Sequence, residues 1–362
     1  MSKTLKLNGD EVEILPGESV LELARRMGQE IPSLCHDPRL KAVGACRTCL
    51  VEVEGIRRLV PSCATKASEG MSVTTANARI ERHQKALFAL YMTDNVDASE
   101  TDDSSDPSEL HALAAKVGAP TTWPRMEHKR FQRLEDRNPY IEYRADRCIL
   151  CARCTRYCEE VESVSAITLA GRGSETTIAT ADGRSLLDTT CELCGGCVDV
   201  CPTGAMAEKK PLALSLLPAR KLEKVRTTCN YCGVGCQMDL NIDRTANDGR
   251  GVVAKITSPE AGVLPNDGNL CVKGRFAYQF IDHKDRLKKP LVRDADGQFQ
   301  ETSWEDALRI AADGLQGVAK RHGADSLGFV SSSRCTGEEN YLVQKLSRAV
   351  FGTHNVHQCA AT

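Results

Sequence analysis

The chain has 362 residues, of which 18 are cysteine and only 4% are aromatic. Its 47 Lys and Arg residues are balanced by 49 Asp and Glu residues, and the net charge of −2 excludes the basic field that holds nucleic acid. The N-terminus lacks an apolar signal core, and the longest apolar stretch, 211–219, is too short to cross a bilayer. We therefore expect a cytoplasmic chain with no membrane span. In a reducing cytosol its cysteines are metal ligands or reactive thiols rather than disulfides.

The first residues predict a small domain that begins with a hairpin and a helix. Apolar residues alternate on both sides of an Asn8-Gly9 turn, which is a hairpin signal. Ser19 and Glu22 form a capping box for the helix that follows, and Gly28 ends it.

Four cysteines come next, three on one loop and one from a later segment: Cys35, Cys46, Cys49 and Cys63. This arrangement wraps and shields a 2Fe-2S cluster. Zinc is the alternative, but zinc usually takes two C-x2-C pairs. The hairpin, helix and cysteine loop resemble the β-grasp ferredoxin domain, here residues 1–78. The long first gap is similar to that in the N-terminal domain of the complex I large subunit, iron hydrogenases and NAD-linked formate dehydrogenases.

Two further quartets repeat the spacing of the bacterial two-cluster ferredoxin, in which the fourth cysteine of each run binds the other cluster. We expect one 4Fe-4S cage of Cys148, Cys151, Cys154 and Cys201, and a second of Cys191, Cys194, Cys197 and Cys158. The residues between the runs predict a hairpin with its turn at Asp182-Gly183. We assign this two-cluster domain to residues 139–210.

A fourth quartet, in residues 222–285, has three clustered thiols and one distant one: Cys229, Cys232, Cys236 and Cys271. It suits a 4Fe-4S cluster, with a zinc knuckle as the alternative. The motifs CNYCGVGC and NLCVKGRF resemble those in the N-terminal domain of the molybdopterin oxidoreductases. That resemblance implies a bis-molybdopterin guanine dinucleotide holding molybdenum or tungsten beside the cluster. It also implies that Lys273 relays electrons between cluster and pterin.

Relatives with this N-terminal arrangement often carry another cluster, held by one histidine and three cysteines. Here no cysteine occurs between Cys63 and Cys148, so we expect that cluster to be lost. We interpret residues 79–138 as a helical connector with an acidic, Ser-rich linker at 94–109, and His83, His111 and His128 as ordinary polar residues.

Residues 286–362 predict the start of an α/β domain. Ser303 caps a helix whose apolar residues follow one stripe: Leu308, Ala311, Ala312, Leu315 and Val318. A buried strand should follow at 326–332. Thr336 and Glu339 then form a second capping box, and Gly352 ends a helix that should bury Leu342, Leu346, Ala349 and Val350 on one face.

The sequence of residues 332–360 is similar to that of the same segment in the formate dehydrogenase branch of the family. The resemblance implies that Arg334, Thr336, Glu338 and Asn340 bind the pterin dinucleotide, whereas Cys335 is not a metal ligand. In that branch the metal-binding cysteine or selenocysteine comes four residues after the position of Cys359, so we expect it beyond Thr362. We interpret the end at Thr362 as a UGA selenocysteine codon read as a stop. A deliberately shortened chain is the alternative.

The sequence thus predicts a multidomain α+β and α/β protein that carries one 2Fe-2S and three 4Fe-4S clusters. The resemblance implies the catalytic subunit of a formate dehydrogenase, whose iron-sulfur or flavin partner subunit receives the electrons through NAD, ferredoxin or a hydrogenase. Two alternatives stay open: a subunit that only transfers electrons, as in a hydrogenase or complex I, and a nitrate reductase. The residues alone should not catalyse the reaction without the metal ligand.

Overall fold

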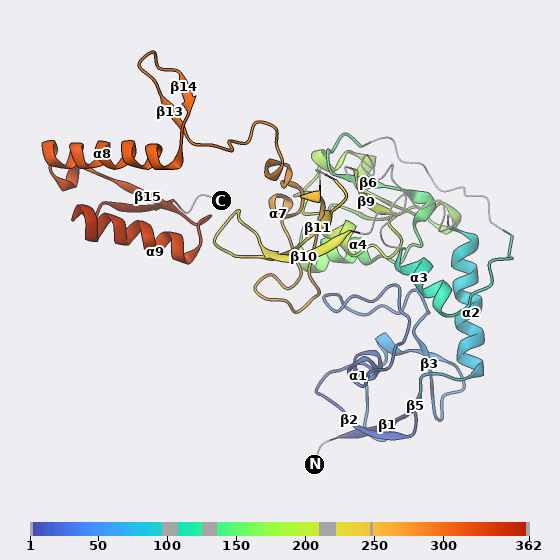
Figure 1. Ribbon diagram of the computed structural model, residues 1–362. Helices are drawn as coiled ribbons and strands as arrows, with labels where there is room; N and C mark the ends of the chain where they lie inside the picture. The colour runs from blue at the N-terminus through green and yellow to red at the C-terminus, as the bar shows by residue number, and fades with distance from the viewer. Residues whose placement is uncertain (1–2, 96–107, 125–135, 210–221, 247–248, 360–362) are drawn as a thin grey trace. The chain divides into compact units, whose positions relative to one another are not determined.

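The computed structural model describes residues 3–95, 108–124, 136–209, 222–246 and 249–359. The chain divides into two compact units, Met1–Glu223 and Lys224–Thr362, each of which is described by itself (Figure 1). The predicted multidomain mixture of helices and strands is confirmed.

The first unit begins with a five-stranded sheet in the order β2-β1-β5-β3-β4. Its elements are β1 (Thr4–Leu7), β2 (Asp10–Glu13), α1 (Val20–Arg26), β3 (Leu50–Val53), β4 (Val60–Pro61) and β5 (Ser72–Thr74). Strand β1 pairs antiparallel with β2 and parallel with β5. The predicted hairpin is confirmed, because Leu7 lies opposite Asp10 and the two turn residues both have positive φ.

Helix α1 covers the sheet through an apolar face that is completely buried. The predicted capping box is present: the Ser19 hydroxyl accepts from the Glu22 N–H at 3.3 Å, and the Glu22 carboxylate accepts from the Ser19 N–H at 2.7 Å. Gly28, with φ +75°, follows the last helical turn as expected.

Two connector helices, α2 (Ala78–Thr93) and α3 (Glu109–Lys116), join the sheet domain to the next one. Phe88 of α2 and Leu110 of α3 are fully buried in a core that also contains Leu34, Cys35, Cys46, Ala114 and Ile149. The sheet domain and the following domain therefore share one core. Most of the predicted acidic linker, 96–107, lies outside the described residues, and so does His128.

The remainder of the first unit is built from short elements: β6 (Ile141–Tyr143), α4 (Arg153–Arg156), β7 (Thr168–Ala170), β8 (Thr177–Ala179), α5 (Gly196–Asp199) and β9 (Met206–Glu208). Strands β6 and β9 pair antiparallel. The repeated spacing of the two cysteine runs is matched by a repeat in the backbone. Leu150 and Leu193 have φ of 55° and 54°, and Ala152 and Gly195, which precede the one-turn helices, have φ of 59° and 76°.

The predicted hairpin between the two cysteine runs is present, but its turn does not lie at Asp182-Gly183. Strands β7 and β8 pair antiparallel with Ala170 opposite Thr177, so the turn spans 171–176. Gly171 and Gly173 both have positive φ, and a Cβ on Gly171 would lie 2.8 Å from the Glu175 carbonyl oxygen. Asp182 and Gly183 instead form a separate tight turn after β8. The sequence held two turn signals, and the closer glycine pair forms the hairpin.

The second unit holds a three-stranded sheet, β10 (Glu223–Thr228), β11 (Gln237–Asp243) and β12 (Val252–Thr257), followed by α7 (Val272–Phe276). Its core contains Cys229, Met238, Ile256, Leu270 and Tyr278. Next come the hairpin β13 (Leu291–Arg293) and β14 (Phe299–Glu301), then α8 (Trp304–His322), β15 (Phe329–Ser332), α9 (Gly337–Lys345) and β16 (Val356–Cys359). Strands β15 and β16 pair in parallel.

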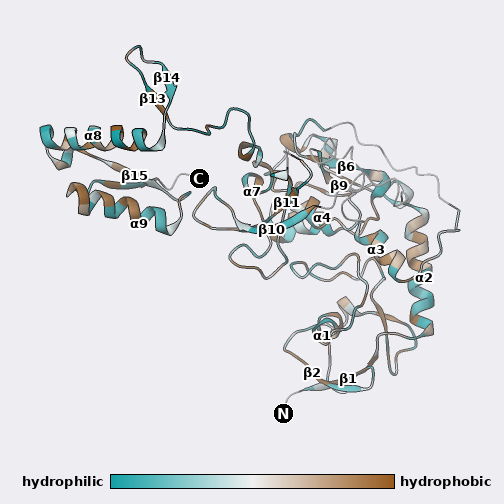
Figure 2. Cartoon of the chain, in the orientation of Figure 1, coloured by the Kyte–Doolittle hydropathy of each residue, from teal (hydrophilic) through white to brown (hydrophobic). Residues whose placement is uncertain are grey.

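The helices and strand predicted after residue 300 are present with their caps, but their predicted burial is wrong. Leu308 of α8 is 62% exposed, Leu342 of α9 is 58% exposed, and Val330 of β15 is 70% exposed. Leu346 and Val350 are exposed as well. Figure 2 shows brown, apolar residues along both helices. Burial needs a covering element, and within the described residues none covers these faces.

Among the described helices, none has the length and apolar character of a membrane span.

Gly196 offers a test of packing in the first unit. Tyr157 is 1% exposed, its ring lies where a Cβ on Gly196 would be, and the Arg39 guanidinium lies 5.2 Å from the ring centroid. We expect Gly196→Ala to destabilise the unit by about 3 kcal/mol because the enclosed ring cannot move away. Urea unfolding measures this. Gly314→Ala in α8 is the control, since nothing lies within 4 Å of its Cβ position. Equal unfolding midpoints for Gly196→Ala and the parent chain would contradict the packing described.

Candidate metal centres

The four cysteines of the first quartet meet in the sheet domain and are all buried. Cys35, Cys46, Cys49 and Cys63 are exposed by 1%, 2%, 0% and 3%. The Cys46 N–H donates to the Cys35 sulfur at 3.4 Å. Hydrogen bonds from the thiols of Cys46 and Cys63 lower the pKa of Cys35, and the same contacts raise the pKa of those two partners. Cys63 also contacts Cys49, so the four sulfurs form one connected set of candidate metal ligands.

The loop that carries these thiols depends on left-handed backbone at two positions. Gly44 and Arg47 both have φ of 60°. A Cβ on Gly44 would also lie 3.2 Å from the Pro61 side chain, so a larger residue there would strain the backbone and crowd Pro61. The Ser62 hydroxyl donates to the Cys49 carbonyl at 2.8 Å, which joins the loop to the segment that supplies the fourth thiol.

The next eight cysteines surround two separate cavities in the first unit. One cavity is lined by Cys148, Cys151, Cys154 and Cys201, together with apolar residues such as Ile149, Ile178 and Met206. The other is lined by Cys158, Cys191, Cys194 and Cys197, together with Ile141, Ile167 and Leu186. These groupings are the crossed sets expected from the sequence, three thiols from one run and one from the other.

Backbone N–H groups point at the sulfurs of both cavities. Cys148, Cys191, Cys194 and Cys201 each accept one at 3.4 Å, and Cys158 accepts the Ala166 N–H at 3.2 Å. Burial raises the pKa of Cys154, and the neighbouring Cys201 and Cys151 raise it further. Thiols crowded into an apolar cavity, with N–H donors aimed at them, fit a thiolate-bound metal cluster, whose cations replace the protons.

The fourth quartet lies in the second unit and is more open. Cys229 is 8% exposed, whereas Cys271 is exposed. Burial raises the pKa of Cys229 and Cys236, and the nearby thiols of this quartet add to that effect. The Cys229 N–H donates to the Cys236 carbonyl at 2.7 Å, which closes the loop. The four thiols therefore approach one another.

Lys273 lies in the first turn of α7, two residues after Cys271, and is half-buried. The adjacent Gly274 lets this helix approach the cysteine loop, since its Cβ position is 3.7 Å from the Cys229 sulfur. The predicted relay lysine is thus attached to the quartet through one helix.

The residues predicted to bind a pterin dinucleotide surround the start of α9. Arg334 lies over the Tyr231 ring at 5.6 Å, next to the cysteine loop. Thr336 caps α9, and Asn340 donates to the carbonyls of Ser332 and Thr336 at 3.3 and 3.0 Å, so both shape the loop. Glu338 is exposed in the first turn. The Arg334 guanidinium therefore lies beside the segment that carries Cys229 and Cys232.

Sequence reasoning missed the arginines at the core between the sheet domain and its neighbour. Arg153 and Arg156 are 9% and 8% exposed, and Asp37 is 5% exposed. The one available signal was the position of both arginines inside a cysteine run, where a buried cation can offset the negative charge of thiolates.

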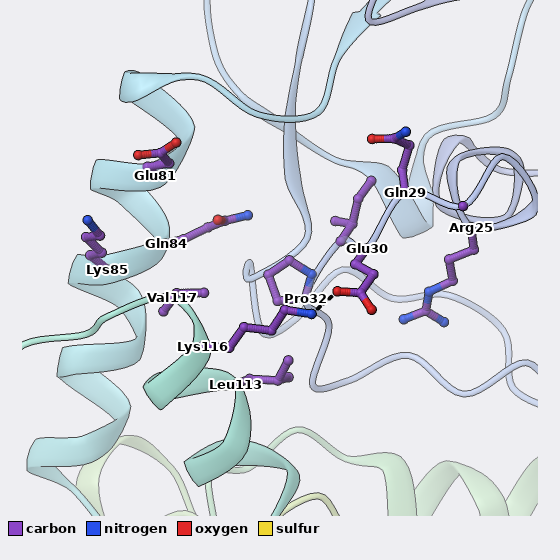
Figure 3. A pocket seen from close by; sticks show the side chains of 12 residues that line it. Arg25, Gln29, Glu30, Pro32, Glu81, Gln84, Lys85, Leu113, Lys116 and Val117 are labelled. Atoms are coloured by element: carbon purple, nitrogen blue, oxygen red, sulfur yellow. Dashed lines mark hydrogen bonds and ion pairs between the residues drawn. The ribbon is translucent and has the colours of Figure 1, made fainter.

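A pocket away from the thiols lies between the end of α1 and the connector helices (Figure 3). Its lining mixes bases and acids: Arg25, Lys85 and Lys116 with Glu30 and Glu81. Lys116 pairs with Glu30 across it. In the described parts of the chain, no three His, Cys, Asp or Glu side chains have the geometry of a site for a single metal ion.

Four family profiles match successive parts of the chain. Residues 3–78 match a 2Fe-2S iron-sulfur cluster binding domain, and residues 138–207 match the ferredoxin-like domain of NADH-quinone oxidoreductase subunit 3. Residues 222–283 match the molybdopterin oxidoreductase Fe4S4 domain, and residues 286–362 match the molybdopterin oxidoreductase profile.

Similar whole proteins carry several different names. The alpha subunit of an NADPH-Fe(3+) oxidoreductase from Geobacter sulfurreducens is 32% identical over 98% of this chain and 40% of its own length. A subunit of the NADH-quinone oxidoreductase of Rhizobium meliloti is 36% identical over 97% of this chain and 40% of its own length. A Staphylococcus aureus protein named "Putative formate dehydrogenase" is 29% identical over 98% of this chain and 38% of its own length. The chain therefore spans about two fifths of these relatives.

Among solved structures, the crystal structure of an NAD+-reducing [NiFe]-hydrogenase is similar to 58% of this chain and 88% of the matched chain. Its TM-score is 0.51 and its sequence identity 31%.

Crossed ligation of the two cavities gives a testable pattern of iron loss. We expect Cys201→Ala and Cys148→Ala each to remove about four irons per chain, and the double variant to lose no more than either single variant. Cys201→Ala combined with Cys191→Ala should lose about eight, because it opens both cavities. Iron and acid-labile sulfide assays measure this, with Cys335→Ala as the control outside the quartets. Additive loss for Cys201 with Cys148 would contradict the crossed grouping.

Proposed function

Because the chain belongs to the molybdopterin oxidoreductase family and carries N-terminal 2Fe-2S and 4Fe-4S ferredoxin-like domains, we propose that it is part of the catalytic subunit of a formate dehydrogenase. In the proposed reaction, formate is oxidised to carbon dioxide and two electrons leave along the iron-sulfur centres to a partner subunit. The oxidoreductase assignment follows from the family. The substrate is the proposal.

One observation carries the electron-transfer part of this proposal: sixteen thiols converge in four sets, two of them around apolar cavities. The name of the Staphylococcus aureus relative and the wording of residues 332–360 support formate as the substrate. The hydrogenase structure supports an NAD-linked partner subunit.

When bound, a molybdenum or tungsten pterin cofactor would supply the two-electron acceptor, and the clusters would supply one-electron carriers. The chain's own residues bind and tune these groups. We propose the sixteen quartet cysteines as cluster ligands, as one 2Fe-2S and three 4Fe-4S sets. The N–H groups that donate to their sulfurs stabilise added negative charge, and the apolar cavity walls exclude water.

On the pterin side we propose Arg334 as the cation that contacts a phosphate group, because its guanidinium is planar and permanently charged and lies beside the cysteine loop. Thr336 and Asn340 hold the loop that presents it, and Glu338 lies in the same turn. Lys273 is the proposed link between the fourth quartet and the pterin.

A subunit that only transfers electrons is the second candidate, since the Rhizobium meliloti relative is named as part of an NADH-quinone oxidoreductase and the similar structure is a hydrogenase. Metal and pterin analysis of the full-length, anaerobically purified protein separates the two. We expect molybdenum or tungsten with pterin, and reduction of the clusters by formate. Iron and sulfide alone would favour electron transfer without substrate chemistry. Reoxidation by nitrate, with no response to formate, would favour nitrate reductase.

Replacement of Lys273 tests its proposed relay role. We expect Lys273→Met to slow formate-dependent cluster reduction about tenfold or more, which is about 1.4 kcal/mol in the barrier, while iron content stays unchanged. Stopped-flow absorbance of the full-length protein measures the rate. Lys284→Met, an exposed lysine of the same unit, is the control. A variant as fast as the parent protein would show that Lys273 has no part in this step.

A further inference from the structure

Arg156 connects two thiol sets that belong to different domains of the first unit. It lies in α4 between Cys154 and Cys158, which line the two different cavities. Its guanidinium reaches the loop of the first quartet, where Nη2 donates to the Cys35 carbonyl at 2.5 Å and Nη1 donates to the Lys41 carbonyl at 2.6 Å. Arg156 is 8% exposed, so the guanidinium is held away from water.

This buried cation has no carboxylate partner among the residues that the structure describes. Its two bonds go to carbonyls, and its Nε has no hydrogen-bond partner within the described ranges of the chain. The neighbouring Arg153, by contrast, pairs with Glu109 at 2.6 Å and approaches Asp37 at 3.7 Å. A buried guanidinium normally needs a negative partner, because carbonyl dipoles offset only part of the cost of desolvation.

The surroundings of Arg156 supply a different source of negative charge. Cys35 and Cys46 pack in one core cluster with Ile149 and with Cys151 of the first cavity. Tyr91 packs against the same cluster, and its hydroxyl donates to the Cys46 carbonyl at 3.1 Å. The first quartet and the cavity of Cys151 are therefore direct neighbours. A set of four thiolates around iron and sulfide carries net negative charge, and that charge grows by one on reduction.

A second bond supports the same junction. The Lys41 N–H donates to the Glu160 carboxylate at 2.7 Å, so the loop residue that accepts from Arg156 is also held by the helical turn that follows α4. The loop of the first quartet is thus fixed to the cysteine run at two points. Neither point involves a ligand side chain.

We propose that Arg156 is the shared counter-cation of these two centres: it fixes the Cys35 loop against the centre of Cys148, Cys151, Cys154 and Cys201, raises the reduction potential of the first quartet's cluster, and makes the two centres direct partners in electron transfer. The inference rests on the proposed role of the quartets as cluster ligands. In the transfer one electron leaves one centre and enters the other, and no bond or proton moves. A fixed cation in a low-dielectric interior favours the more negative, reduced state.

The test uses redox titration of the full-length holoprotein, followed by electron paramagnetic resonance of the 2Fe-2S signal. We expect Arg156→Gln to lower the ratio of reduced to oxidised 2Fe-2S cluster about tenfold at a fixed potential, a shift of about 59 mV to more negative values. Arg156→Lys keeps the positive charge but loses the guanidinium with its two Nη donors. Its midpoint potential should stay close to that of the parent protein. Arg172→Gln, an exposed arginine of the same domain, is the matched control.

Two results would overturn the proposal. The first is an unshifted midpoint in Arg156→Gln at full iron content. The second is a midpoint shift in Arg156→Lys as large as that in Arg156→Gln, which would show that the hydrogen bonds of the guanidinium, not its charge, set the potential. If Arg156→Gln loses iron, Arg156→Lys decides alone: parent-like iron and midpoint support the proposal, and a shifted midpoint rejects it. These readouts need no formate, so a protein that is inactive with formate but shifted here fails only the proposed function.

Discussion

The burial of thiols is the constraint on which the rest of this structure depends. Three of its core clusters contain cysteines, and the first holds Cys49 and Cys63 among residues that are almost fully buried. With aromatic residues at 4% of the composition, the small domains have few large side chains to fill a core. The buried thiol sets fill the cores of these domains instead. A bound cluster would therefore be both the electron carrier and the element that joins distant segments of each domain.

The same constraint explains why the domains of the first unit are not independent. Leu34 and Cys35 of the first loop share a core with Phe88 and Leu110 of the connector helices and with Ile149 of the following domain. Electron tunnelling decays steeply with distance, so centres must be held close, and a shared core holds them better than a flexible linker. The buried cation at this junction stabilises negative charge where two centres meet.

Much of this arrangement was predictable from residue spacing, because spacing encodes local geometry. The Ser19 and Thr336 capping boxes and the Asn8-Gly9 hairpin depend on residues within a few positions of one another, and all three are present. The crossed cysteine grouping was accessible because the two runs repeat one unit. The position of the hairpin turn was not, since two glycine-containing turns competed in one segment.

Long-range features could not be predicted from one sequence. The exposure of Leu308 and Leu342 depends on which elements cover α8 and α9, and local periodicity carries no such information. The role of Arg156 required knowledge of which loop faces α4.

The relatives agree on oxidoreductase chemistry and differ in name, so the centres matter more to this account than the substrate does. Metal analysis of the anaerobically purified protein tests the central claim most directly. We predict about fourteen irons per chain with matching acid-labile sulfide, the sum of one 2Fe-2S and three 4Fe-4S clusters. Zinc in place of iron, or far fewer irons in folded protein, would contradict it.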